Sequence, residues 1–233
     1  MKDNKKILWL ITARSGSKGV PNKNIKKIAG IPLIEYKIKS ALNSKYPDFV
    51  WISTDSKNYA QIGENAGAFV PFIRPPELAT DSSSSIDVVL HAMNYAEELN
   101  LSFDFIGLLE PTSPFVSEKS LNKALEFLIS NKTADGIVSV KEVLPHPIFL
   151  QNDGKYLKDL SLNIESIKNQ NRQNFLTQIT PSGGFYISRW NSFLKNKTFY
   201  CKKTLAYKLY AEESIEIDTL EDFEYASYMK NSK

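Results

Sequence analysis

Residues 11–24, ITARSGSKGVPNKN, bring together side chains that could hold phosphate groups. The stretch follows the apolar run KKILWLI and contains glycines, hydroxyl groups and cations but few apolar residues. A bound triphosphate needs backbone N–H groups that can approach closely, hydroxyl donors and positive charge. The alternative is a solvated basic turn, because the stretch matches neither the P-loop nor the G-x-G-x-x-G fingerprint. The candidates are Gly16 and Gly19 for backbone approach, Ser15 and Ser17 for hydroxyl donation, and Arg14, Lys18 and Lys23 for charge.

A second stretch, SIEIDTLEDF (214–223), alternates apolar and acidic residues and could hold a metal ion. On a strand, Ile215 and Ile217 would enter the core while Glu216 and Asp218 share the opposite face. Adjacent carboxylates repel each other unless a cation lies between them, and Mg²⁺ takes carboxylate and phosphate oxygens together. The pattern therefore indicates a Mg²⁺ site. The alternative is an exposed strand face that leads into the acidic first turn of a helix.

The elements that must position these two stretches alternate between short apolar runs and longer amphipathic ones. This alternation predicts an α/β fold in which a mostly parallel sheet lies between layers of helices. Ligands bind beyond the carboxyl ends of such strands, where the opening loop, Asp55 and the turn starting at Glu110 would fall. The expected strands are 7–12, 49–55, 68–73, 103–110 and 136–143, with Pro71 placing the third at an edge, and the expected helices are 31–43, 56–67, 84–99 and 117–130.

Residues 144–182 break this rhythm, because they are rich in Asn, Gln, Lys and Pro and show weak periodicity. They form either a long loop, which is uncommon inside a compact domain, or an insertion that packs elsewhere. Regular structure is expected to resume with strands at 183–188, 205–210 and 214–218 and a final helix at 219–230.

Composition narrows the class of protein. The net charge of +3 over 233 residues is too small for a nucleic-acid binder, and no basic stripe accompanies it. No apolar stretch approaches the ~20 residues that span a bilayer, so we expect a cytoplasmic protein without membrane contact. Cys201 is the single cysteine, which excludes an internal disulfide and a cysteine-based zinc site.

Several segments together resemble the CMP-sialic acid synthetases (acylneuraminate cytidylyltransferases). ARSGSKGVPNKNI (13–25) is similar to the A-R-x-x-S-K-G-x-x-x-K-N signature that holds CTP in that family. The resemblance covers nearly the whole chain. It implies a nucleotide-sugar-transferase, Rossmann-like fold, one cytidylyltransferase domain over 1–233, and a homodimer in which 144–182 reaches the partner's active site. The further similar segments are RPPELATDSSSS (74–85), LEPTSPF (109–115), HP (146–147), RQ (172–173), SGGFYI (182–187) and IEIDTLEDF (215–223).

The resemblance also implies a reaction and roles for individual residues. The anomeric hydroxyl of a nine-carbon keto-sugar acid would attack the α-phosphorus of CTP, and pyrophosphate would leave. Arg14, Lys18 and Lys23 would offset phosphate charge, and Asp218 is the candidate base. The implied CTP contacts are Arg14, Ser17, Lys23, Asn24, Arg74, Ser83 and Ser85; the sugar contacts are Glu110, Thr112, Ser113, Arg172 and Gln173; and the Mg²⁺ ligands are Glu216 and Asp218.

Departures from the family pattern fall mainly on the proposed sugar side. Glu110 stands where Gln is common, Phe115-Val116 where Leu-Arg is frequent, and Ser182-Gly183 where Asn-Gly is frequent. Glu216 also replaces a common Asp. A carboxylate at 110 favours hydroxyl and N–H donors and disfavours a nearby carboxylate, so the acceptor stays open among sialate, legionaminate, pseudaminate and other nonulosonates.

Two alternatives to the cytidylyltransferase interpretation remain. One is a nucleotidyltransferase of the same fold for another base or sugar, such as Kdo, which a comparison of nucleotides and acceptors would separate. The other is a non-catalytic nucleotide-binding protein, which would bind CTP without releasing pyrophosphate. Lys23, Glu216 and Asp218, which such a protein would not need, favour an enzyme.

Overall fold

The computed structural model describes residues 5–17, 19–143, 150–152, 157–159 and 178–232. The chain divides into two compact units, of which the first comprises Met1–Val140 with Pro181–Lys233 and the second Lys141–Thr180. Within the second unit, β7 (Leu150–Asn152) and β8 (Leu157–Asp159) form an antiparallel hairpin.

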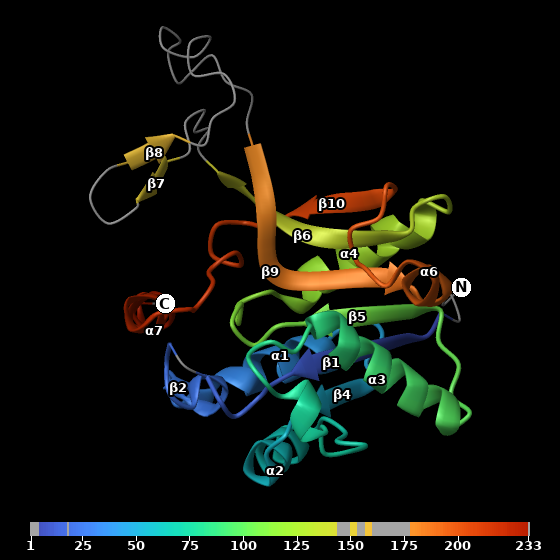
Figure 1. Cartoon of the computed structure of the whole chain (residues 1–233), viewed down its shortest axis with the longest axis horizontal. Coiled ribbons are helices and arrows are strands. Elements are labelled where there is room, and N and C mark those ends of the chain that lie inside the picture. Colours follow the sequence, from blue (N-terminus) through green and yellow to red (C-terminus); the bar gives the residue numbers. More distant parts are fainter. Residues whose placement is uncertain (1–4, 18, 144–149, 153–156, 160–177, 233) are drawn as a thin grey trace, which may run out of the picture. The chain divides into compact units, whose positions relative to one another are not determined.

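A six-stranded sheet forms the centre of the first unit, with the order β10-β6-β9-β5-β1-β4 (Figure 1). β1 pairs in parallel with β4 and β5, and β10 pairs in parallel with β6, while β9 runs antiparallel to β5. The predicted α/β fold with a mostly parallel sheet is therefore confirmed. The strands are β1 (Ile7–Thr12), β4 (Val50–Ser53), β5 (Phe105–Leu109), β6 (Gly136–Val143), β9 (Gln178–Arg189) and β10 (Thr204–Lys208).

Helices cover both faces of this sheet. Alternate residues of β1 enter two different cores, with Trp9 packing in the cluster that holds α1, α2 and α4, and Leu10 in the cluster that holds α3 and α6. This alternation is what a strand buried on both faces requires. The helices are α1 (Leu33–Leu42), α2 (Lys57–Asn65), α3 (Ser85–Glu98), α4 (Glu118–Ser130), α6 (Trp190–Asn196) and α7 (Leu220–Asn231).

Hydroxyl side chains fix the starts of four helices. Ser56, Ser84 and Ser117 each accept a hydrogen bond from a backbone N–H in the first turn of α2, α3 and α4. Thr219 forms a capping box with Asp222 at the start of α7. Such caps satisfy backbone N–H groups that have no partner within the helix. These caps fix where α3 and α7 begin, next to Ser85 and Asp218.

Two predicted strands are wrong in detail. Residues 68–73 form only isolated parallel bridges beside β4, at Trp51–Phe69 and Thr54–Ile73, because Pro71 lacks the N–H that a continuous ladder needs. Ser214 ends a turn, and residues 215–218 have no regular secondary structure and belong to no strand. Ile217 nevertheless enters a third small core with Phe223 of α7, and its N–H donates to the carbonyl of Thr112 over 2.8 Å.

Several short elements were not predicted from the sequence. They are the 3-10 helices η1 (Lys23–Ile25) and η2 (Pro76–Leu78) and the two-residue strands β2 (Lys27–Ile28) and β3 (Ile31–Pro32). η1 continues from the opening loop. In the described part of the chain, no helix combines the length and apolar character needed to cross a membrane.

Candidate active site

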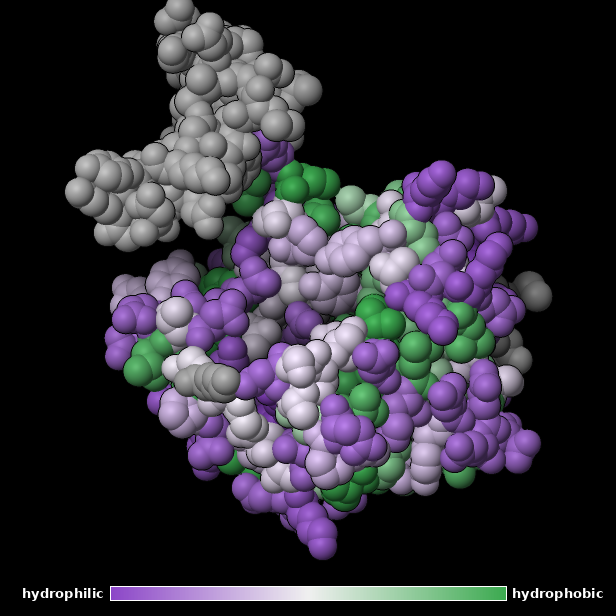
Figure 2. Space-filling model, viewed as in Figure 1, coloured by the Kyte–Doolittle hydropathy of each residue, from purple (hydrophilic) through white to green (hydrophobic). Residues whose placement is uncertain are grey.

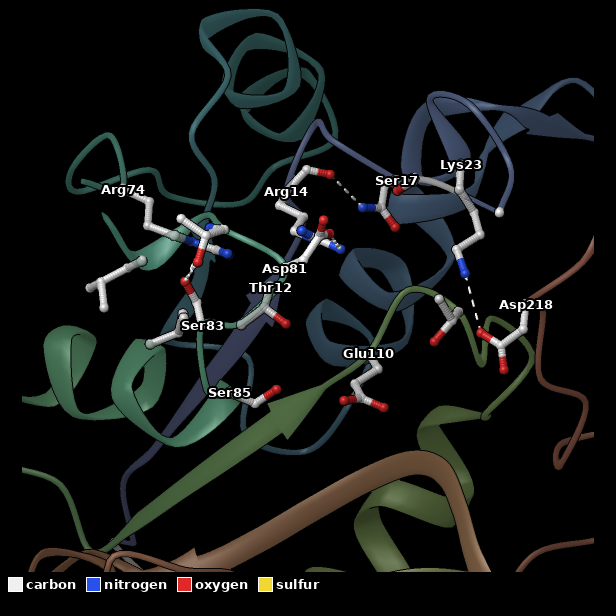
Figure 3. A pocket seen from close by; sticks show the side chains of 16 residues that line it. Thr12, Arg14, Ser17, Lys23, Arg74, Asp81, Ser83, Ser85, Glu110 and Asp218 are labelled. Carbon is white, nitrogen blue, oxygen red and sulfur yellow. Dashed lines mark hydrogen bonds and ion pairs between the residues drawn. The ribbon is translucent and has the colours of Figure 1, made fainter. Parts of the chain in front are cut away.

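A pocket of about 420 Å³ opens where β1 and β5 end. Figure 2 shows that hydrophilic side chains cover much of this face of the molecule. In Figure 3, Arg74 and Ser83 lie at one end of the pocket and Lys23 and Asp218 at the other, with Arg14 and Asp81 between them. We call the wall that carries Arg14, Arg74, Ser83 and Ser85 the nucleotide side, after the CTP contacts that the resemblance implies. The predicted site residues that line the pocket are Arg14, Ser17, Lys23, Asn24, Arg74, Ser83, Ser85, Glu110, Thr112 and Asp218.

The opening loop is held in place by Asp55, which follows β4. The backbone N–H of Ser15 donates to Asp55 Oδ1 over 2.8 Å, and the Ser15 hydroxyl donates to Oδ2 over 2.7 Å. The Ser15 hydroxyl therefore anchors the loop, which corrects its predicted use as a phosphate donor. The position of Asp55 at the carboxyl end of a strand was visible in the sequence, but its partner was not.

Asn24 closes the same loop from within. Its side chain is buried, with 6% exposed, and its Nδ2 donates to the carbonyl of Arg14 over 3.0 Å. The amide therefore shapes the loop as well as bordering the pocket. Because one N–H is used in this way, only its remaining polar atoms are free for the predicted contact with the cytosine end.

Lys23 joins the opening loop to the acidic segment at 215–218. Its Nζ donates to the carbonyl of Ile217 over 2.7 Å and lies 3.3 Å from Asp218 Oδ1 (Figure 3). Gly19 lies against the same segment, since a Cβ at this position would be 2.6 Å from the carbonyl oxygen of Asp218. The close approach that Gly19 permits is thus to Asp218, whereas a Cβ at Gly16 would meet no atom within 4 Å.

The two arginines of the nucleotide side are held by different partners. Arg74 is 5% exposed, and its guanidinium donates to the hydroxyl of Ser53 over 2.9 Å and to the Ser53 carbonyl. Burial lowers the pKa of Arg74 to about 10, with Asp55 opposing the change and Arg14 adding to it, so the side chain stays charged at neutral pH. Arg14 Nη2 forms an ion pair with Asp81 Oδ1 at 2.7 Å, and a phosphate would compete with Asp81 for it.

The start of α3 completes the nucleotide side. Ser83 donates its hydroxyl to the carbonyl of Glu77 over 2.8 Å and accepts from the N–H of Thr80, which folds the preceding turn against the helix. Ser84 caps the helix, and Ser85 is its first residue. Ser83 and Ser85 both border the pocket. The partial positive charge of a helix N-terminus thus adds to the arginines and favours an anion there.

The opposite wall, which we call the acceptor side after the sugar contacts that the resemblance implies, carries Glu110 and Thr112. Gly183 of β9 lies against it, since a Cβ there would be 3.4 Å from Glu110 Oε2. Glu110 directly follows β5 and points into the pocket (Figure 3). Burial raises the pKa of its carboxyl to about 7, while the nearby cation of Lys37 opposes this and the charges of Glu216 and Asp218 add to it. Ser113, a predicted sugar contact, is instead buried and donates to the carbonyl of Ser182 over 3.2 Å.

The residues present fit a magnesium ion only in part. Asp218 lines the pocket, and the Glu216 carboxylate lies on the acceptor side, where its Oε1 is 2.6 Å from the point a Cβ at Gly183 would occupy. Among the described residues, no group of three acidic, His or Cys side chains could hold a metal alone. Two carboxylates suit Mg²⁺ when phosphate oxygens and water complete its oxygen ligands, as they do in many nucleotide enzymes.

Three predicted site residues, Lys18, Arg172 and Gln173, lie outside the described residues. Conversely, the structure adds residues that the sequence analysis did not single out, namely Lys37, Asp81, Tyr186 and Tyr200. Tyr186 and Tyr200 line a smaller pocket of about 180 Å³ that shares Ser85 and Glu110 with the first, and burial raises the pKa of Tyr186. Alternation along β9 could have identified Tyr186, but nothing local marked Asp81.

Comparisons with known proteins show the family and the fold of the chain. The sequence profile of the family described as Cytidylyltransferase matches residues 8–231. The CMP-N,N'-diacetyllegionaminic acid synthase of Legionella pneumophila is 35% identical over 219 residues, which are 92% of this chain and 91% of that protein. The N-acylneuraminate cytidylyltransferase of Escherichia coli is 34% identical over 229 residues, 98% of this chain but 53% of that protein, so the chain spans about half of that relative. A solved structure of a CMP:2-keto-3-deoxy-manno-octonic acid synthetase complexed with CTP has the same fold, with a TM-score of 0.71 at 15% identity, covering 98% of this chain and 99% of the other.

Proposed function

The chain belongs to the cytidylyltransferase family, and from that premise we propose that it transfers CMP from CTP to a nonulosonic, sialic-like acid and releases pyrophosphate. The observation that carries the proposal is the bridge made by Lys23. One side chain joins the basic opening loop to Asp218, so a cation for the phosphates and a carboxylate for the attacking hydroxyl lie 3.3 Å apart.

CTP is proposed to bind across the nucleotide side. Arg14 and Lys23 would contact the phosphates, and Ser17 would donate its hydroxyl. Arg74 and Asn24 would recognise the cytosine end, and the start of α3 would hold the nucleoside. A triphosphate entering this pocket would replace Asp81 as the partner of Arg14, which is exposed enough to turn toward it. Lys18 belongs to the same loop in the sequence, and we propose that it lies beside the phosphates.

The transfer is a substitution at the α-phosphorus. The anomeric oxygen of the acceptor forms a bond to this phosphorus, the bond to the pyrophosphate oxygen breaks, and the hydroxyl proton goes to a base, for which we propose Asp218. Arg14 and Lys23 would offset the charge that gathers on the phosphates, and positioning supplies most of the remaining catalysis. The Asp218 side chain is 79% exposed and already hydrogen-bonded to Lys23, so a proton can pass from it to water.

We propose Glu216 and Asp218 as the protein ligands of Mg²⁺. When bound, the ion would offset phosphate charge and orient the leaving pyrophosphate. A homodimer in which residues 144–182 reach the partner's site is also proposed, together with contacts of Arg172 and Gln173 to the sugar. Arg172 would pair with the acceptor carboxylate, because its fork of donors matches two oxygens.

For the acceptor, we propose a nonulosonate of the legionaminate type. The Legionella relative, which this chain matches over nearly its whole length, is named for N,N'-diacetyllegionaminic acid. Glu110 agrees with this choice, since a carboxylate in the pocket can accept from hydroxyl and N-acyl N–H groups.

The test is Mg²⁺-dependent release of pyrophosphate from CTP with N,N'-diacetyllegionaminate, N-acetylneuraminate, pseudaminate and Kdo as acceptors. ATP, GTP and UTP serve as nucleotide controls, and Lys27→Met, which changes an exposed cation outside the pocket, as the matched protein control. We expect release with CTP and one nonulosonate only. Tight CTP binding without release for any acceptor would contradict the proposal and favour a non-catalytic role.

A further inference from the structure

A lysine lies fully buried beneath the acceptor side. Lys37 is 0% exposed and lies on α1 between Leu33 and Ala41, at the spacing of the apolar face of the helix. Lysine is almost never buried completely unless it is paired, because removing its charge from water is costly. Its Nζ donates to the carbonyl of Gly184 over 2.6 Å. A position that packing would give to an apolar residue is therefore occupied by a cation.

The segment of β9 that Lys37 contacts, Gly183–Gly184, also borders Glu110. Gly183 has a φ of 63°, in the left-handed region, and a Cβ there would lie 3.4 Å from Glu110 Oε2 and 2.6 Å from Glu216 Oε1. Lys37 thus holds the carbonyl of Gly184, while Glu110 lies against the residue immediately before it. The Lys37 cation and the Glu110 carboxylate therefore both lie against the same two residues of β9, with the cation in the core and the carboxylate at the pocket.

Glu213 is the second acid near Lys37, but its carboxylate is already hydrogen-bonded to the start of α4. Its carboxylate accepts from the backbone N–H of Ser117 over 2.8 Å and from the hydroxyl of Ser120, at the start of α4. Among the hydrogen bonds between described residues, none involves the carboxylate of Glu110. Glu110 is therefore the acid near Lys37 whose carboxylate oxygens remain available to a ligand.

The electrostatics of the two side chains agree with this geometry. Burial lowers the pKa of Lys37 to about 7, and the charge of Glu110 is the first influence that opposes the change, followed by that of Glu213. Burial raises the pKa of Glu110, and the charge of Lys37 is the first influence that opposes it. Each charge makes the burial of the other less costly.

We propose that Lys37 is a positioning residue of the acceptor side, which balances the buried charge of Glu110 and holds Gly183–Gly184 of β9 in place so that Glu110 selects the acceptor. The proposal rests on the proposed function for what Glu110 contacts. A neutral Gln at 110 would leave the Lys37 cation buried without that partner, so the two residues belong together.

The test is a double-mutant cycle of Lys37→Met, Glu110→Gln and the double variant, with Lys39→Met as the control. Lys39 lies on the same helix but is half-exposed and pairs with Glu35, away from the pocket. Each protein is followed by thermal unfolding at neutral pH without substrate, and by separate KM values for CTP and for the acceptor. Unfolding needs no turnover, so it tests the pairing even if the wild-type chain transfers nothing, whereas absent turnover in the wild type would count against the proposed function alone.

We expect Lys37→Met to lower the unfolding midpoint and to raise the acceptor KM about tenfold, while the CTP KM changes less than about twofold. Adding Glu110→Gln should restore part of the lost midpoint, because it removes the unbalanced carboxylate. Additive effects on the midpoint would overturn the pairing, and an equal rise in both KM values would overturn the acceptor-side role. If Lys37→Met alone does not fold, a folded double variant supports the pairing and an unfolded one contradicts it.

Discussion

The nucleotide side and the acceptor side of the pocket carry opposite charges and obtain them in different ways. The cations of the nucleotide side come from the opening loop and from Arg74, and they are held by Asp81 and Ser53. On the acceptor side, Glu110 meets Glu216 and the buried Lys37, which come from three segments far apart in the chain. One wall suits a polyanion, and the other suits a ligand rich in hydroxyl and N–H donors.

Because of this difference, we expect substitutions in the two walls to have different effects on kinetics and stability. On the nucleotide side, Arg14 is partly exposed and its partner is on a surface turn, so altering it should change kinetics more than stability. On the acceptor side, altering one charge leaves another buried without compensation, so stability and specificity should change together. Lys23 and Asp218 lie where the walls meet, and the largest effects are expected there.

The largest effect should follow removal of the divalent ion or of Asp218. A chelator should abolish turnover, and Asp218→Asn should reduce kcat by about 10³-fold, because both the proposed base and a proposed metal ligand are lost. Pyrophosphate release measured across a Mg²⁺ titration checks both. Glu221→Gln, which changes an exposed acid in the first turn of α7, is the control. Full activity of Asp218→Asn would remove this residue from the junction of the two walls.

Lys23→Met should lower kcat by about 10²-fold, since one cation is lost from the phosphates. It should also loosen the 215–218 segment, because Lys23 is bonded to Ile217 and Asp218. Steady-state kinetics, with Lys27→Met for comparison, measure the loss. A variant that changes only the acceptor KM would show that Lys23 serves the acceptor side instead.

Gly19→Ala and Gly16→Ala form a matched pair within one loop. Gly19→Ala should lower stability by about 1–3 kcal/mol and reduce turnover, because the new Cβ meets the Asp218 carbonyl. Gly16→Ala has open space in the structure and should leave thermal unfolding nearly unchanged. Calorimetric titration with CTP then shows whether Gly16 lies against the phosphates, in which case its affinity falls without any loss of stability. Equal unfolding midpoints for the two variants would contradict the packing of Gly19 on Asp218.

The smallest effect concerns pH. The pKa of Glu110 is raised from 4.5 to about 7 in the folded chain, so the folded state holds this proton more tightly than the unfolded one. The resulting stability is fully present below pH about 4.5 and is lost as pH rises through about 7. Between these limits the wild type should lose on the order of 1–3 kcal/mol relative to Glu110→Gln. Thermal unfolding of both proteins at several pH values checks the slope, and parallel curves would show that the carboxyl is not buried as described.

The two walls also differ in how far the sequence could predict them. The parallel sheet and the approximate positions of its six strands followed from periodicity, and the closeness of Arg14 and Lys23 followed from a loop contiguous in sequence. Arg74 and Ser85 were assigned to the same site only by the resemblance to the synthetase family. Asp55 and Asp81 could not be assigned partners, since their contacts depend on turns that join separate elements. The helix that contains Lys37 was predicted from its apolar pattern, but Lys37 itself was not singled out. Its spacing from Leu33 and Ala41 nevertheless places it on the buried face of that helix.

The segment at 214–218 shows the same limit from the other side. Its alternation correctly placed Ile217 in the core, but the strand was wrong because no neighbouring strand pairs with it. Alternation reports which side chains are buried, whereas a strand also needs a partner, and only tertiary structure supplies one. The carboxylates of Glu216 and Asp218 nevertheless lie close enough to Glu110 for their charges to raise its pKa, although burial is the larger cause.

The most direct test follows the α-phosphorus itself. CTP labelled at this position would be incubated with the chain, Mg²⁺ and N,N'-diacetyllegionaminate, and the products would be separated. The account predicts that the label moves into a conjugate of CMP with the acceptor, while one unlabelled pyrophosphate is released for each conjugate formed. Label that stays in CTP, or that appears as free CMP at the same rate without acceptor, would contradict the assignment of this pocket to CMP transfer.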